Sequence, residues 1–187
     1  PVGITSKKQL INLTAEQRPR VLARYFLSEL WAITNNYTKP ETFFKPVKET
    51  PEMLRGTAMH LLCQERLKKL GYEVEPKKEI NIGLVTIVGR ADAIKDTREH
   101  GLEIKTSGKW EIMYKAKPWA LYQAKCEASL FEIPVFFVVQ PILKRDGRFI
   151  LQAIGKAERD DDWFAEQVKL VQVFHERLIS ISSRAKS

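Results

Sequence analysis

The segment GLEIKTS, residues 101–107, has the composition of a short β-strand and carries two opposite charges. Side chains alternate between the two faces of a strand, so Glu103 and Lys105 point to the same face. The apolar residues Leu102 and Ile104 favour an interior strand, where a buried carboxylate and ammonium are costly unless another group uses them. The alternative is a surface ion pair on an edge strand. This segment is therefore the first candidate for a functional site.

A third charged side chain is predicted to lie beside this strand. Residues 84–95 have the apolar alternation of a strand, interrupted by Asp92, and the turn DTREHG at 96–101 follows them. The two strands are then antiparallel neighbours, which places Asp92 and Glu103 at about the same level. Adjacent carboxylates repel each other, and a divalent cation removes that repulsion; hard oxygen ligands select Mg²⁺ or Mn²⁺. Lys105 would then lie beside the metal, where it can orient a water or offset charge on a phosphate.

The Glu-x-Lys spacing is weak evidence when it is taken alone. The same spacing occurs at Glu75-Pro76-Lys77, although Pro76 disfavours a central strand and no acidic residue lies on a preceding hairpin arm. The informative pattern is an aspartate on one arm of a hairpin and Glu-x-Lys on the next arm.

His60 is a further candidate, within a helix predicted from Pro51 to about Leu70. Gly56 precedes His60 by one turn on the same face, and a glycine inside a helix costs about 1 kcal/mol relative to alanine. Such a glycine usually permits the close approach of another group. The alternative for His60 is that it packs against the sheet and binds nothing.

The segment after Lys105 combines basic and aromatic residues. Lysines neutralise phosphates and aromatic rings stack on bases, so this segment predicts contact with nucleic acid. Gln123 is expected on the inner face of the helix predicted at 114–132. The alternative is an ordinary amphipathic helix with aromatic residues inward and lysines outward. The lysines are Lys109, Lys115, Lys117 and Lys125, and the aromatic residues are Trp110, Tyr114, Trp119 and Tyr122.

Composition places limits on the class of protein. The chain has 187 residues, of which 44% are hydrophobic, and 31 basic residues against 23 acidic residues give a net charge of +8. A single folded domain with a polyanionic partner, nucleic acid first, is the expectation. No apolar run approaches the ~20 residues that cross a bilayer, so no membrane partner is predicted. Cys63 and Cys126 lack disulfide or metal spacing, and the first residues lack a signal-peptide core, so we expect a reducing, cytoplasmic setting.

The predicted order of elements is helix, helix, three-stranded meander, helix, β-hairpin and helix. This order indicates an α/β fold, a mixed central sheet flanked by helices, with one parallel β-α-β connection. The predicted domain spans 1–187, with a helical extension at 1–50, a core at 51–155 and a C-terminal helix within 156–187. The helices are expected at 17–34, 51–70, 114–132 and 161–181, and the strands at 72–80, 84–95, 101–107, 134–143 and 148–155.

These motifs together resemble the PD-(D/E)XK nuclease superfamily, especially its RecB-type branch, over about residues 55–140. RGTAMH, VGRAD, EIK and YQAKCEASL are similar to four of its motifs. The resemblance implies a restriction-endonuclease-like αβββαβ core. It also implies His60, Asp92 and Glu103 as metal ligands, the Ile104 carbonyl as a further ligand, Lys105 as catalytic lysine and Gln123 beside the DNA.

The sequence departs from the family pattern at three points. No proline precedes Asp92, Glu127 stands where a tyrosine is expected four residues after Gln123, and the four cysteines of the iron–sulfur members are absent. The small size and the composition rich in lysine and isoleucine suggest a stand-alone archaeal or viral nuclease, in the host cytoplasm if it is viral.

Three functions follow as alternatives. The first is a DNA nuclease dependent on Mg²⁺ or Mn²⁺, either an exonuclease or an endonuclease, that acts on duplex, single-stranded or branched DNA. The second is a Holliday-junction resolvase, for which the helix at 161–181 offers the apolar face of a homo-oligomer, a dimer or a tetramer. The third is a DNA-binding protein that has a nuclease fold without catalysis. DNA or RNA as substrate, strand polarity and the number of metals stay open.

Overall fold

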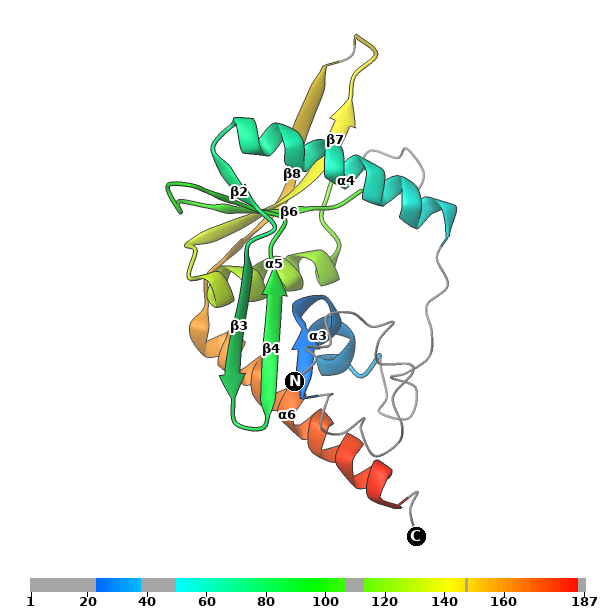
Figure 1. The fold of residues 1–187 in the computed structure, drawn as a ribbon, viewed down its shortest axis with the longest axis vertical. Coiled ribbons are helices and arrows are strands. Elements are labelled where there is room, and N and C mark those ends of the chain that lie inside the picture. Colours follow the sequence, from blue (N-terminus) through cyan, green and yellow to red (C-terminus); the bar gives the residue numbers. More distant parts are fainter. Residues whose placement is uncertain (1–22, 38–49, 107–112, 147, 185–187) are drawn as a thin grey trace. The chain divides into compact units, whose positions relative to one another are not determined.

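The computed structural model describes residues 23–37, 50–106, 113–146 and 148–184 (Figure 1). The chain divides into two compact units. We call residues 49–78 and 89–164 the five-stranded unit, and residues 1–48, 79–88 and 165–187 the three-stranded unit. No helix within the described ranges is long and apolar enough to cross a membrane.

A mixed sheet forms the centre of the five-stranded unit, with the strand order β2-β5-β6-β7-β8. β6 and β7 run parallel, and the other neighbours run antiparallel. β7 lies between two partners, which explains the uninterrupted apolar run in its sequence. The strands are β2 Tyr72–Val74, β5 Ala93–Lys95, β6 Gly101–Ile104, β7 Val135–Leu143 and β8 Phe149–Glu158.

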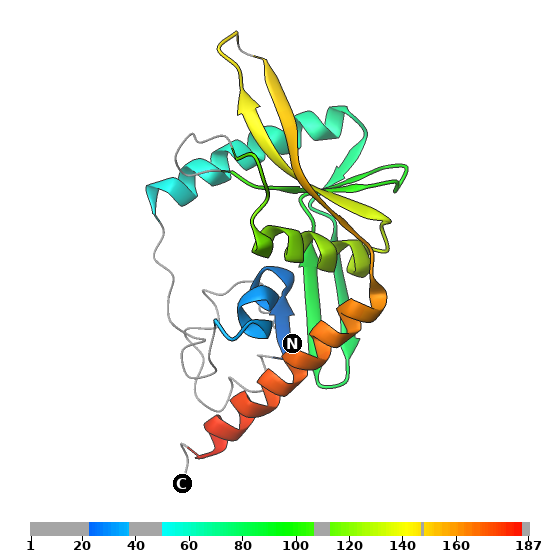
Figure 2. The same ribbon diagram turned by 180° about the vertical axis from the view of Figure 1, so that it is seen from behind.

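Two helices, α4 (Pro51–Lys69) and α5 (Pro118–Phe131), lie on opposite faces of this sheet (Figures 1 and 2). Cys63 and Leu67 of α4 are buried against a cluster of apolar sheet residues, and burial of a leucine contributes about 1.5–3 kcal/mol. α5 is the crossover between the parallel strands β6 and β7. The predicted fold class, a mixed sheet with helices on its faces, is confirmed.

The predicted boundaries of α4 are confirmed within a residue. Proline suits the first turn because its missing N–H needs no partner there, and Pro51 is the first helical residue. Gly71, with φ of 75°, follows the end of the helix in the left-handed conformation that glycine adopts most readily.

The long strands predicted at 72–80 and 84–95 are wrong, because each is broken in the middle. The first divides into β2 and β3 (Lys77–Ile82), and the second into β4 (Val85–Arg90) and β5. Pro76 has no N–H for a strand ladder, and the preceding Glu75 has a φ of 53°. The breaks face each other, since Ala91 N–H donates to the Pro76 carbonyl and Glu75 N–H donates to the Asp92 carbonyl, each at 3.2 Å. β2 and β5 therefore belong to one sheet, and β3 and β4 to another.

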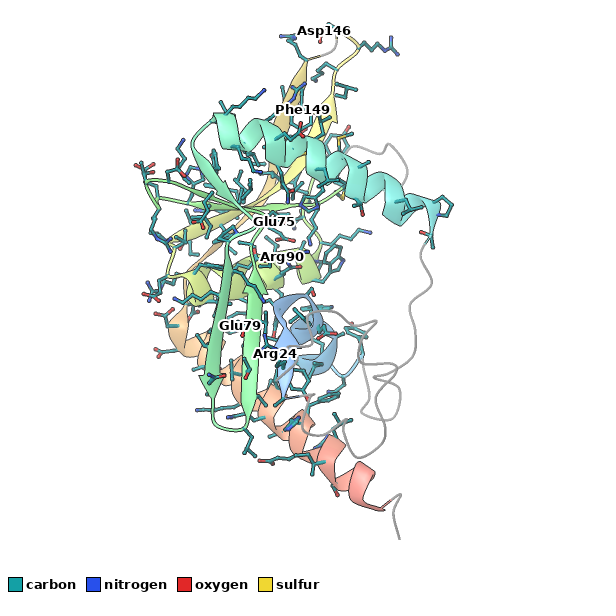
Figure 3. All side chains as sticks on the ribbon, viewed as in Figure 1. Arg24, Glu75, Glu79, Arg90, Asp146 and Phe149 are labelled. Carbon is teal, nitrogen blue, oxygen red and sulfur yellow. The ribbon has the colours of Figure 1, made fainter. Side chains whose placement is uncertain are left out.

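The three-stranded unit contains a sheet with the order β1-β4-β3, in which β1 (Arg24–Phe26) runs parallel to β4. The helix predicted at 17–34 is wrong for residues 24–26, because pairing with β4 overrides their helical periodicity; its residues 17–22 lie outside the described ranges. The helix of this segment is α3 (Leu27–Thr34). Figure 3 labels Arg24 and Glu79, which form an ion pair between β1 and β3.

The last helix, α6 (Asp161–Arg184), matches the prediction and extends three residues further. Val168, Val171, Phe174 and Leu178 form its buried stripe. Within the three-stranded unit, the buried hydroxyl of Tyr25 lies 2.9 Å from Nδ1 of the buried His175. This hydrogen bond satisfies both polar groups away from water.

Replacement of Gly101 by alanine is expected to destabilise the five-stranded unit. A Cβ at this position would lie 2.2 Å from Cζ of Phe136, whose ring is fully buried on the neighbouring strand. Overpacking of this kind costs about 1–3 kcal/mol. Urea unfolding of G101A measures the loss, and G101A/F136L, in which a smaller side chain replaces the ring, should recover part of it. An unchanged unfolding free energy in G101A would contradict this packing.

Candidate active site

Asp92 lies in the bend between β4 and β5, at the edge of the sheet where β6 ends. Ala93 pairs with Leu102 in the antiparallel register of β5 and β6, so Asp92 stands at the level of Glu103. Its Oδ2 accepts a hydrogen bond of 2.5 Å from the backbone N–H of Ile104. The break in the predicted strand thus turns the side chain of Asp92 toward Ile104, the residue between Glu103 and Lys105.

His60 reaches Asp92 from α4. Its Nε2 lies 2.9 Å from Oδ1 of Asp92, and this buried nitrogen has no aligned hydrogen-bond partner among the described residues. The contact with Asp92 raises the pKa of His60. Two adjacent ligands of an octahedral Mg²⁺, each about 2.1 Å from the ion at right angles, are about 3 Å apart. The separation of these two atoms therefore suits a shared cation.

Gly56 brings α4 close to the end of β6. A Cβ at Gly56 would lie 2.8 Å from Oγ1 of Thr106, one residue beyond Lys105. The close approach predicted for this glycine is observed, and it lies one helical turn from His60.

Buried Glu103 and half-buried Lys105 form an ion pair on the face of the sheet that α5 covers. Glu103 is 2% exposed, and its Oε1 pairs with Nζ of Lys105. The ammonium also donates to Oε1 of Gln123 at 3.1 Å and lies 4.7 Å from the ring centroid of Trp119. Three neighbours thus contact the ammonium group of Lys105. These contacts restrict the side chain to fewer conformations than an exposed lysine has.

Glu127 completes a chain of polar contacts from α5. It is fully buried, and its Oε1 accepts a hydrogen bond of 2.9 Å from Nε2 of Gln123. Burial, followed by the nearby Glu103, raises the pKa of Glu127 well above its usual range. Burial, followed by the nearby Asp92, raises the pKa of Glu103 to about 7. Sequence reasoning had assigned Glu127 no role, although its spacing of four from Gln123 on one helix face was the available signal.

Two oxygens of this network have no donor. Oε2 of Glu103 and Oε2 of Glu127 are buried without a hydrogen-bond partner among the described residues. A buried carboxylate is costly unless a cation or a proton compensates its charge. Lys105 compensates one negative charge in a region that holds Asp92, Glu103 and Glu127. Glu127 also interacts with the carboxyl of Glu103, and this contact contributes to its raised pKa. A proton held between the two carboxyls, or a bound cation, would supply the missing compensation.

The donor chemistry fits a hard divalent cation, but the ligands are not already gathered. Within the part of the chain that the structure describes, no three side chains of His, Cys, Asp or Glu lie close enough to hold a metal ion. His60 and Asp92 are adjacent, whereas the carboxylate of Glu103 is directed toward Lys105. Nε2 of His60 and Oε2 of Glu103 are ligand atoms of the type that Mg²⁺ and Mn²⁺ accept.

The residues predicted to bind DNA lie at different places. Tyr122 and Lys125 are on a side of α5 away from Gln123: the Tyr122 ring packs edge-on against Trp163 at 5.0 Å, and Lys125 pairs with Asp160 at 2.7 Å. Both line an open groove of about 670 Å³ between α5 and the end of β8. Lys115 and Lys117 are exposed on the segment before α5, and Lys109 lies outside the described residues.

No protein-family model matches the sequence, and no curated protein matches it. Solved structures do match the fold. The alkaline exonuclease LHK-Exo from Laribacter hongkongensis has a TM-score of 0.62 at 20% identity, over 92% of this chain and 96% of that chain. LHK-Exo in complex with dAMP has a TM-score of 0.64 at 19% identity, over the same shares. A phage-related exonuclease from Haemophilus somnus 129PT has a TM-score of 0.53 at 14% identity, over 96% of this chain and 89% of that chain. The chain therefore has a nuclease fold of the restriction-endonuclease-like type.

Proposed function

We propose that this protein is a metal-dependent DNA nuclease that hydrolyses phosphodiester bonds. The observation that carries the proposal is that two pairs, His60 with Asp92 and Glu103 with Lys105, lie where β6 ends, within a fold shared with exonucleases. LHK-Exo was solved with dAMP, a deoxynucleotide, which supports DNA as the substrate class. Because LHK-Exo and the phage-related protein are exonucleases, we place exonuclease activity ahead of endonuclease activity.

His60, Asp92 and Glu103 would hold Mg²⁺ or Mn²⁺, with the Ile104 carbonyl as a further ligand. When bound, the cation would offset the negative charge that develops on the phosphate and polarise its oxygen. This assignment rests on the 2.9 Å separation of the His60 and Asp92 atoms and on the buried oxygen of Glu103 that lacks a donor.

Lys105 would supply the positively charged side chain that acts on the scissile phosphate. Its ammonium donates hydrogen bonds, so it can orient the attacking water and stabilise an oxygen of the scissile phosphate. Glu103, Gln123 and Trp119 hold it in position before the substrate arrives. A preorganised charge pays no reorganisation cost during the reaction, which makes it more effective than a mobile lysine.

A substrate panel tests the proposal. Linear duplex, single-stranded DNA, closed circles and four-way junctions are incubated with Mg²⁺, with Mn²⁺ and with EDTA. We expect mononucleotides from linear DNA and no cutting of closed circles, with the activity lost in EDTA. Junctions cut faster than duplex would favour the resolvase alternative. If no substrate of the panel is cut in Mg²⁺ or in Mn²⁺, only the DNA-binding alternative is left.

Glu127 is expected to position Gln123 and through it Lys105. Glu127→Gln preserves an oxygen that accepts from Gln123, and adds an N–H that faces the carboxyl of Glu103, so kcat should remain within a few-fold of wild type. Glu127→Leu removes both contacts, and a misplacement of about 1 Å can cost on the order of 100-fold in kcat. Single-turnover cleavage and thermal unfolding of both variants check this. A Glu127→Leu variant with the kcat of wild type would refute the role.

A further inference from the structure

β7 and β8 continue well beyond the candidate active site. β6 ends at Ile104, which pairs with Val139, and Lys105 N–H donates to the Val139 carbonyl at 2.9 Å. β7 runs on to Leu143, paired with Phe149 of β8. At about 3.4 Å per residue, Leu143 lies roughly 13 Å farther along the strand than Val139. We call residues 140–146 and 148–152 the ribbon; Figures 1 and 2 show it projecting past α4.

The tip of the ribbon is strongly basic and exposed. Lys144, Arg145 and Arg148 accompany a single acidic residue, Asp146, and all four are exposed. Arg148 pairs with Asp146 at 2.7 Å. Because Asp146 is the single acidic residue of the tip, the positive charges of Lys144 and Arg145 have no acidic counterpart there. Figure 3 labels Asp146 at the tip.

The lower part of the ribbon is anchored to α4. The Phe149 ring packs against the apolar cluster that α4 forms with the sheet, and the guanidinium of Arg66 lies 4.8 Å from its centroid. Leu151 packs against the same cluster. These contacts hold the ribbon in a fixed direction from the sheet edge that carries Glu103 and Lys105.

Charged residues and prolines often prevent an unpaired strand edge from pairing with another chain, but this role does not explain the basic tip of the ribbon. Beyond Val139 no described strand pairs with β7 on the β6 side, and Pro141 removes one donor from that edge, as is usual at sheet edges. Lys144 and Arg145 lie past the last strand pair, Leu143 with Phe149, so they protect no edge. A polyanion is the partner that matches their charge.

We propose that the basic tip of the ribbon binds the phosphate backbone of duplex DNA about four to six base pairs from the phosphate at Glu103 and Lys105. The distance follows from the roughly 13 Å of strand, extended by the reach of the two side chains, at about 3.4 Å per base pair. The proposal rests on the proposed nuclease function and adds a second contact to it. Lys144 and Arg145 provide that contact.

The binding test compares two double variants that each lose two exposed positive charges, Lys144→Ala/Arg145→Ala and the control Lys169→Ala/Arg177→Ala on α6. Fluorescence anisotropy with a labelled 20-base-pair duplex, in EDTA and at several salt concentrations, measures the slope of log K against log salt. Loss of two phosphate contacts should make this slope less steep by about 1.8 in the ribbon variant. A slope no different from that of the control would overturn the proposal.

A kinetic test separates this proposal from the proposed function. Bis(4-nitrophenyl) phosphate is too small to reach the ribbon, so the ribbon variant should hydrolyse it as wild type does, while its KM for the duplex rises. Equal losses on both substrates would overturn the ribbon contact. If wild type hydrolyses neither substrate, the nuclease proposal fails, and the salt slopes still decide whether the ribbon binds DNA.

Discussion

Lys105→Met is expected to lower kcat for DNA cleavage by about 10²–10³-fold, the usual loss when one preorganised donor to a reacting oxygen is removed. Methionine keeps the unbranched stem of the side chain beside Trp119 and removes the ammonium that Glu103 and Gln123 hold. Single-turnover cleavage of an end-labelled duplex, with enzyme in excess, measures the chemical step without product release.

Lys68→Met is the matched control, because Lys68 is exposed near the end of α4 and is not among the residues predicted to bind DNA. It removes the same charge and should leave kcat almost unchanged. Glu103 loses its cation in Lys105→Met, so thermal unfolding must confirm that this variant is folded at the assay temperature. A folded Lys105→Met variant with a kcat within threefold of wild type would exclude Lys105 from the chemistry.

Asp92→Asn is expected to weaken Mn²⁺ binding by at least about 100-fold, the upper end of the range for changes even to outer residues of metal sites. The amide replaces a charged ligand, and an N–H₂ group then competes for the place beside His60. The backbone N–H of Ile104 can still donate to the remaining amide oxygen, so the local fold should persist. Calorimetric titration with Mn²⁺ in the absence of DNA reports the affinity directly.

Glu99→Gln provides the control for the metal titration, since Glu99 is an exposed acid in the turn between β5 and β6. It should bind Mn²⁺ as wild type does. His60→Gln tests the second ligand and should also lower the affinity, because its Nε2 is the atom 2.9 Å from Asp92. Unchanged titration curves for Asp92→Asn would show that the carboxylates serve another purpose, such as the retention of a proton within the buried network.

The network of acids around Lys105 has a cost for folding. Glu103 and Glu127 are almost completely buried, and each has one oxygen without a donor among the described residues. Groups of this kind are retained at functional sites more often than elsewhere, because an apolar core would be more stable without them. Burial is the largest cause of the raised pKa of both carboxyls, because it disfavours the charged form. The same effect makes the buried acids unfavourable for folding.

Elements with strong local signals were predicted well. Pro51 and Gly71 mark the ends of α4 through backbone conformation alone, and the apolar run of β7 reports its burial between two strands. Pro76 is a local signal for the break at Glu75. The break at Asp92 has no such signal, because it depends on cross-strand hydrogen bonds between residues about 16 positions apart in sequence. β1 was missed for a related reason, since its partner β4 lies some 60 residues away.

The chemical content of the site could be predicted from local sequence: a Glu and a Lys on one strand face, and an Asp on the preceding arm of the same hairpin. These relations depend on the alternation of a strand and on a short turn, which are local properties. Two other relations depend on tertiary packing: the contact of His60 with Asp92, and the link from Glu127 through Gln123 to Lys105. Contacts between helices and a sheet depend on how the elements pack, and no short stretch of sequence encodes that distance.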